Sequence, residues 1–202
     1  MDWRELIAVI LLSVTTILTA WCGFQSSKWG GEMSIAFSKA SGARIEAVQA
    51  QDTGNRKISV QVGLFSAWLQ AQATDNKELA DFLSTRFPEP LAAAFLAWQA
   101  TDPLTNPDAP LSPFEMTEYQ VPETDEASTL NAKADDLFAA ALEDNQRGDN
   151  YTLLAVAFAT VLFFAAISGR MKGRRYQWAI LSVGLVVFAV ATAILLLLPR
   201  DF

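Results

Sequence analysis

The chain has 202 residues, 51% of them apolar, and carries 15 Lys and Arg against 22 Asp and Glu, a formal net charge of −7 at pH 7. This acidic balance argues against nucleic acid as a partner. The chain contains no histidine and one cysteine. The first removes the commonest general base and transition-metal ligand, and the second excludes an internal disulfide. We therefore expect no enzyme activity and no metal or other cofactor.

Apolar residues concentrate in three windows that contain no charged side chain, residues 6–24, 151–168 and 178–198. Each is long enough, at 1.5 Å rise per residue, to cross a hydrocarbon core of roughly 30 Å. We predict three transmembrane helices, within residues 1–24, 151–168 and 178–198. A cleaved signal peptide is the alternative for the first, but its basic start is weak because Arg4 is flanked by Asp2 and Glu5. A retained anchor is favoured.

The short segment 169–177 between the second and third windows holds four cations and no acid: Arg170, Lys172, Arg174 and Arg175. Lys and Arg concentrate in short cytoplasmic loops, so this basic loop is expected in the cytoplasm. The N-terminus is then cytoplasmic, and residues 25–150 and the tail 199–202 lie outside. Binding of an anionic lipid or an acidic partner is a further role for the loop, although its effect on topology already explains it.

The outer segment 25–150 holds nine Lys and Arg against nineteen Asp and Glu and begins with a stripe of alanines. Small residues at spacings of 4, 3, 4 and 3 let helices approach closely, and they are Ala36, Ala40, Ala43, Ala47 and Ala50. Residues 51–55 predict a turn or irregular break, and Gly30-Gly31 a kink. A second helical face is expected at Ile58, Val62, Phe65 and Leu69.

Further along the domain, Asp75 with Glu78 predicts a helix start, and Pro88 and Pro90 end that helix. A short helix follows, with Leu91, Phe95 and Trp98 on one face. The Pro-rich segment 102–122 is expected to be a loop that packs against the helices through its apolar residues: Leu104, Leu111, Phe114, Met116 and Tyr119. A last helix, starting near Leu130, is expected to continue past Gly148 into the second span.

The predicted fold class is therefore all-α, an integral membrane protein with three transmembrane helices and an extracytoplasmic antiparallel helical bundle. Two sets of residues are candidate sites. Thr15 and Thr19 share a face of the first span and, with Asn145 and Asn150 at its mouth, are candidates for pore lining or helix packing. Trp68, Phe95, Trp98 and Phe114 are candidates for core anchors or for the walls of a ligand pocket.

Three sequence segments, 19–25 (TAWCGFQ), 86–87 (RF) and 112–114 (SPF), resemble those of a group of uncharacterised bacterial inner-membrane proteins. That group shares an N-terminal anchor, an outer (periplasmic) helical region and a closing membrane hairpin. The resemblance implies a location in the bacterial inner membrane. It implies no activity and no catalytic residues.

Two functional hypotheses follow. The first is a non-enzymatic multi-pass membrane protein that assembles through its helices, as a scaffold or accessory subunit or as a homo-oligomeric pore. Its partners would be the lipid bilayer and either further copies of this chain or another membrane protein. The alternative is an extracytoplasmic sensor or ligand-binding module that acts through a partner protein, with the aromatic residues forming its pocket.

Overall fold

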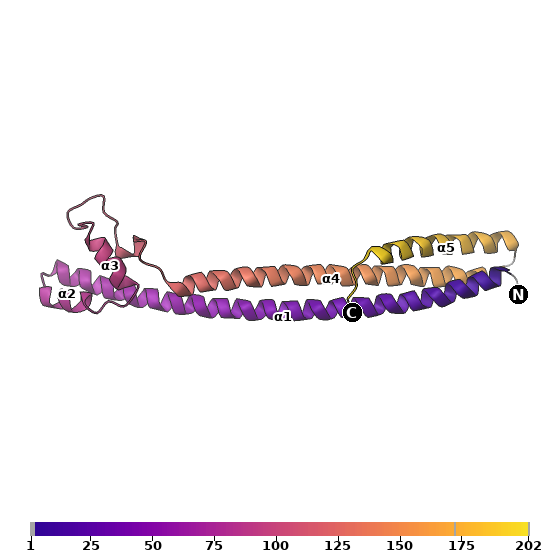
Figure 1. Ribbon diagram of the computed structural model, residues 1–202, viewed down its shortest axis with the longest axis horizontal. Coiled ribbons are helices and arrows are strands. Elements are labelled where there is room, and N and C mark those ends of the chain that lie inside the picture. Colours follow the sequence, from indigo (N-terminus) through magenta and orange to yellow (C-terminus); the bar gives the residue numbers. More distant parts are fainter. Residues whose placement is uncertain (1–2, 172, 202) are drawn as a thin grey trace. The chain divides into compact units, whose positions relative to one another are not determined.

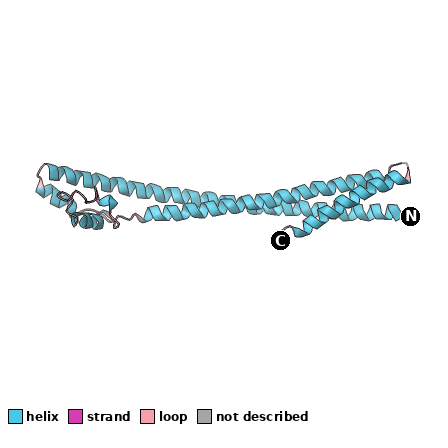
Figure 2. Cartoon of the chain, turned by 90° about the horizontal axis from the view of Figure 1, so that it is seen from above, coloured by secondary structure: helices cyan, strands magenta, loops and turns pink. Residues whose placement is uncertain are grey.

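The structure, a computed structural model, describes residues 3–171 and 173–201. Its regular secondary structure is helical, joined by loops, and the described residues contain no β-strand (Figure 2). The elements in chain order are α1 (Trp3–Ala73), α2 (Lys77–Ser84), α3 (Leu91–Gln99), the 3-10 helix η1 (Pro113–Glu115), α4 (Pro122–Ser168) and α5 (Arg174–Leu197). The all-α prediction is confirmed.

The chain divides into two compact units. Unit 1 consists of Met1–Ala40 and Asp135–Phe202, and unit 2 consists of Ser41–Ala134. Both boundaries fall inside a helix, since α1 and α4 each contribute residues to both units. The helix expected to run from the outer domain past Gly148 into the second span is therefore confirmed as α4.

Unit 1 contains three helices that are long and apolar enough to cross a membrane, belonging to α1, α4 and α5. The three candidate spans predicted from the sequence are thereby confirmed. Within this unit α1 and α4 run antiparallel, because Ser26 bonds to Thr152 while Phe37 contacts Phe138. Helix α5 returns along α4 after the chain turns at Gly169 and Arg170 (Figure 1).

The face that α4 buries in unit 1 repeats with the spacing of a coiled-coil seam. From Gly148 onward its buried residues are separated by steps of three and four, and they are Gly148, Tyr151, Leu154, Phe158, Val161, Ala165 and Ser168. Against them pack Cys22 and Trp29 from α1 and Ala191 and Leu195 from α5. Such a repeat keeps one stripe of α4 turned towards its neighbours over the whole length of the unit.

Helix α1 continues without a break through residues 51–55, so the turn or irregular break expected there was wrong. Gly30-Gly31 also lies within the continuous helix. Gly54 is buried against α4: a Cβ added there would lie 3.4 Å from the Cβ of Glu123. This glycine therefore permits a close helix–helix approach instead of making a turn. The neighbouring polar side chains are satisfied along the helix, since Thr53 donates to the carbonyl of Gln49 and Ser59 to that of Asn55.

The alanine stripe of α1 packs inward as expected, with Ala40, Ala43 and Ala47 buried and Ala36 and Ala50 half-buried. Helix α4 has a matching pattern, with a small buried residue at every seventh position: Ala127, Ala134, Ala141 and Gly148. Small side chains at a fixed heptad position allow the two backbones to come close. In unit 2 the pair is also held by Arg44, which donates to Asn131, and by the ion pair between Lys57 and Glu123.

The rest of unit 2 is formed by α2, α3, η1 and the end of α1, and two details differ from expectation. Asn76, not Asp75, caps α2, and its side chain accepts from the amide of Leu79 at 3.1 Å. Helix α1 buries Gln61, Phe65 and Trp68 there, whereas Val62 and Leu69 face outward. The segment before α4 is a loop with one 3-10 turn, and Phe114, Met116 and Tyr119 pack on the core as predicted.

Two apolar residues of that loop do not pack. Leu104 is 76% exposed and Leu111 is 88% exposed, so the expectation that they cover the helices was wrong. The loop is instead tied down between them, where the indole nitrogen of Trp98 donates to the carbonyl oxygen of Pro110 at 2.7 Å. One partly buried hydrogen bond thus ties down the part of the loop where the sequence suggested apolar contacts.

Candidate functional sites

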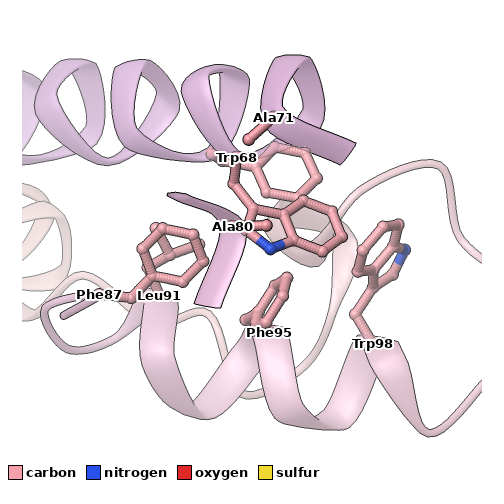
Figure 3. Close-up of a cluster of buried hydrophobic side chains, with 8 residues drawn as sticks. Trp68, Ala71, Ala80, Phe87, Leu91, Phe95 and Trp98 are labelled. Atoms are coloured by element: carbon pink, nitrogen blue, oxygen red, sulfur yellow. The ribbon is translucent and has the colours of Figure 1, made fainter. Parts of the chain in front are cut away.

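The four aromatic candidates of unit 2 come together in one core. Figure 3 shows three of them, Trp68, Phe95 and Trp98, and Phe114 packs against the same cluster. Trp68 comes from α1, Phe95 and Trp98 from α3 and Phe114 from η1. Trp68 and Phe95 lie edge to face with ring centroids 4.8 Å apart. Aromatic pairs favour this geometry because the positive edge of one ring meets the negative face of the other.

Phe65 lies at the centre of this aromatic core, a role that the sequence analysis missed. Its ring is 5.4 Å from Trp98, 5.6 Å from Phe114 and 5.8 Å from Trp68 between centroids. Its position four residues after Gln61, in the alternating steps of four and three that link the buried residues of α1, could have identified it. Because Phe65, Trp68, Phe95 and Trp98 are all buried against one another, their rings fill the interior of unit 2. The arrangement favours core anchors over pocket walls.

The threonines of the first span lie in unit 1. Thr15 is fully buried and its hydroxyl has no hydrogen-bond partner among the described residues. Thr19 is half-buried and donates to the carbonyl of Thr15 at 2.8 Å. Ser13 and Thr16, on the exposed side of the helix, bond to their own i−4 carbonyls in the same way. Thr15 therefore sits between the helices of one chain, which favours packing over pore lining.

Asn145 and Asn150, the proposed mouth residues, bond along α4. Asn145 is exposed and donates to Asp149, while the side-chain oxygen of Asn150 accepts from Gln146. Neither bond links them to Thr15 or Thr19, so the structure does not bring these four residues together through hydrogen bonds. Among the described residues, no group of three or more Cys, Asp and Glu side chains could hold a metal ion.

A clamp of polar contacts holds the C-terminal tail in unit 1. Gln25 is fully buried, and its side-chain amide donates to the carbonyl of Asp201 at 2.8 Å and accepts from the amide of Asp201 at 3.0 Å. The Tyr151 hydroxyl donates to the carbonyl of Pro199 at 2.8 Å, and the Lys28 ammonium lies 3.4 Å from the Asp201 carboxylate. We call these contacts the tail clamp. A glutamine directly after an apolar span was the sequence signal for it.

Trp29 lies about one turn after Gln25 on α1. Arg147 of α4 lies over its ring, with the guanidinium carbon 4.7 Å from the ring centroid. The same guanidinium bonds to Asp144 at 2.9 Å and forms an ion pair with Glu143. A cation held over an indole and satisfied by carboxylates is a stable arrangement at the edge of an apolar region. Trp29 and Arg147 thus brace the α1–α4 pair beside the tail clamp.

A crevice opens at the other end of the unit 1 helices, beside the basic loop. It has a volume of about 310 Å³, and its lining comes from three helices and the turn after α4: Glu5, Ala8, Val9, Leu12, Ala165, Ala166, Ser168, Gly169, Gln177 and Leu181. We call it the loop crevice. Arg170, Arg174 and Arg175 are exposed, whereas Lys172 lies outside the described residues. The sequence analysis identified the cations and missed the crevice.

Comparisons of the chain with known protein families, with curated proteins and with solved structures found no match. The class of protein is therefore defined by the fold itself. It is an all-helical protein with three helices that are long and apolar enough to span a membrane, the pattern typical of a membrane protein.

Proposed function

We propose that the protein is a non-enzymatic multi-pass membrane protein that assembles through its helices, as a scaffold or accessory subunit built from several copies of the chain. The observation that carries this proposal is an exposed apolar stripe on α1 in unit 2. Val48 is 53% exposed, and the stripe continues at Val62, 14 residues after Val48, and at Leu69, 7 residues after Val62. Ile45, which is 59% exposed, lies about one turn before Val48.

The stripe has the geometry of a second helix-packing seam. Residues separated by multiples of seven return to the same face of a coiled-coil helix. The buried seam of α1 at Ala43, Ala47 and Gly54 already faces α4, so Val48, Val62 and Leu69 occupy a separate face. Aliphatic side chains repeated on a water-facing side of a helix favour burial against a further helix, and a second copy of this chain carries a matching stripe.

The placement in the membrane is part of the same proposal. The basic loop supports a cytoplasmic position for residues 169–177, and with it a cytoplasmic N-terminus and an extracytoplasmic position for residues 25–150 and the C-terminal tail. The location that fits the sequence resemblance is the bacterial inner membrane. In this placement the stripe from Ile45 to Leu69 lies in water, where apolar association is strongest.

The experiment is the protein mass of the complex in mild detergent, measured by light scattering with the detergent subtracted. Wild-type protein is expected to run as one species of several copies. Val48→Glu with Val62→Glu is expected to give the monomer, because buried carboxylates in a helix seam are costly. Val60→Glu is the matched control: Val60 is 61% exposed but lies two residues, about 160° around the helix, from Val62. A monomeric wild type would overturn homo-oligomeric assembly.

The pore and the sensor are the weaker proposals. A pore between copies would need polar residues on the outside of the three-helix unit. Ser13 and Thr16 are exposed, but both bond to carbonyls of their own helix, and the candidate Thr15 is buried, which counts against a pore. A sensor would need an accessible face on Trp68, Phe95 or Trp98, and the burial of these rings counts against that. Ion flux through liposomes and ligand-dependent tryptophan fluorescence are the respective tests.

A further inference from the structure

We propose that the loop crevice of unit 1, together with Arg170, Arg174 and Arg175, binds an anionic phospholipid. The phosphate would lie on the arginines, and the upper part of one acyl chain would enter the crevice. The inference rests on the proposal that the chain spans a membrane, but it depends neither on the number of copies nor on which side of the membrane the loop faces.

The first support is the distribution of polarity in the crevice. Its walls along the helices are apolar, with Ala8, Val9 and Leu12 from α1 and Leu181 from α5. Its end nearest the basic loop is polar, with Ser168 and Gly169 at the end of α4 and Gln177 in the first turn of α5. A lipid has the same order of groups, from a polar head to an apolar chain, and a volume of about 310 Å³ holds only part of one chain.

The second support is the charge at that polar end. Arg170, Arg174 and Arg175 are exposed and form no ion pair with any described residue. One carboxylate, that of Glu5, lines the crevice. Three guanidinium groups against one carboxylate leave an excess of positive charge, and guanidinium groups bind phosphate oxygens in a two-pronged geometry.

The third support is the start of α5, which increases the same positive potential. Arg174 and Arg175 occupy its first turn, which has no acidic residue, and its cap residue Gly173 offers no side-chain hydrogen bond. The N-terminus of a helix carries about half a positive charge, so cations are unfavourable there and an anion is favourable. A bound phosphate would offset the charge that the helix and its arginines place at one point.

Glu5 restricts the headgroup. Its carboxylate repels a second anionic group but accepts hydrogen bonds from hydroxyls. A phosphodiester with a hydroxylated headgroup, such as phosphatidylglycerol, therefore fits better than a phosphomonoester. The lipid chemistry favoured by the crevice is one negative charge, donor hydroxyls and a chain that continues along α1 and α5.

The test measures lipid binding to the purified full-length protein by native mass spectrometry, with phosphatidylglycerol or phosphatidylcholine added in detergent. Wild-type protein is expected to retain phosphatidylglycerol preferentially. Arg170→Gln with Arg174→Gln and Arg175→Gln should weaken this binding roughly a hundredfold, at about fivefold per cation. Lys39→Gln with Arg56→Gln and Lys133→Gln removes the same number of exposed cations elsewhere and should leave it unchanged.

A second variant, Ala8→Trp, fills the crevice and keeps every charge. It should also weaken phosphatidylglycerol binding, which separates a lipid site from a purely electrostatic surface. Equal binding of the two lipids, or full binding by both the arginine and the Ala8 variants, would overturn the proposal. So would inorganic phosphate competing as well as the lipid does, since that outcome means a free-anion site. Light scattering on the same samples reports assembly separately.

Discussion

The side chain of Gln25 and the backbone of Asp201 form a closed pair of hydrogen bonds across 176 residues of sequence. The amide of Gln25 supplies both the donor and the acceptor, as a neighbouring peptide group would. Because Gln25 is fully buried, water cannot replace either bond. The C-terminal tail is therefore held to α1 by Gln25, whose side chain is the one buried amide among the described residues of unit 1.

Gln25→Ala should loosen the tail. The substitution leaves the amide and carbonyl of Asp201 without their partners, and such a loss costs about 1–3 kcal/mol in a buried setting. We expect a lower midpoint of thermal unfolding in detergent and faster cleavage of the tail by carboxypeptidase. Gln49→Ala, at an exposed position of the same helix, is the control and should change neither. An unchanged tail in Gln25→Ala would mean that Tyr151 and Lys28 hold it alone.

Substitutions at Gly148 should separate helix propensity from packing. A Cβ at this position would meet the carbonyl oxygen of Ser26 at 3.5 Å and the Cβ of Trp29 at 3.6 Å, both ordinary contact distances. Gly148→Ala should therefore be tolerated and gain up to about 1 kcal/mol from helix propensity. Gly148→Leu should be destabilising, because α1 and α4 would have to move apart.

The measurement for Gly148 is thermal unfolding in detergent followed by circular dichroism. Gly31→Leu is the control, since a Cβ at Gly31 meets nothing within 4 Å. If Gly148→Leu were as stable as Gly31→Leu, the close approach of α1 and α4 near Trp29 would not contribute to stability.

The parts of this fold that were predictable are those encoded locally. The three spans depend on length and lack of charge, and the Ala40–Ala43–Ala47 seam depends on a repeat within one helix, so neither requires a distant partner. Gly54 was misread because its turn-like neighbours are local, whereas its role depends on Glu123, 69 positions along the chain. A glycine flanked by Asp, Thr and Asn predicts a turn from local sequence alone. Its packing role becomes visible only when the contact with α4 is known.

The same reasoning explains the candidate sites. Trp68 and Trp98 were predictable as anchors because large aromatics on periodic faces are usually buried. The loop crevice was not, since its lining comes from three separate segments that only the fold brings together. The outward turn of Val62 and Leu69 was missed for a related reason: their spacing suits a helix face, but Gln61 and Phe65 turn towards the core instead.

Trp98→Phe should free the Pro-rich loop while leaving unit 2 folded. The change keeps an aromatic ring in the core but removes the bond from the indole nitrogen to the carbonyl of Pro110. We expect a loss of about 1–2 kcal/mol in unfolding free energy and faster proteolysis within residues 102–112. Leu111→Ala is the control, because a side chain that is 88% exposed contributes little to packing. Equal proteolysis of the two variants would show that Trp98 does not restrain the loop.

The ion pair between Lys57 and Glu123 should make the pairing of α1 and α4 in unit 2 sensitive to acid. The hydrogen bond from the Lys57 side chain lowers the pKa of the Glu123 carboxyl below its ordinary value of about 4.5. Between the folded and unfolded pKa values the unfolded chain binds more protons, so stability falls as the pH decreases through this range. The contribution of the pair is fully present above pH 4.5 and disappears once the folded carboxyl is protonated.

Glu123→Gln should therefore be less stable than wild type at pH 7, and the difference should shrink at pH 3. The measurement is thermal unfolding at both pH values, with Glu126→Gln as the control. Glu126 borders the same groove between α1 and α4 but forms no ion pair with a described residue, so its removal should leave the wild-type acid sensitivity intact. The stability difference between Glu123→Gln and wild type could also be the same at pH 7 and pH 3. That result would mean that the contribution of Glu123 to stability does not depend on the charge of its carboxylate.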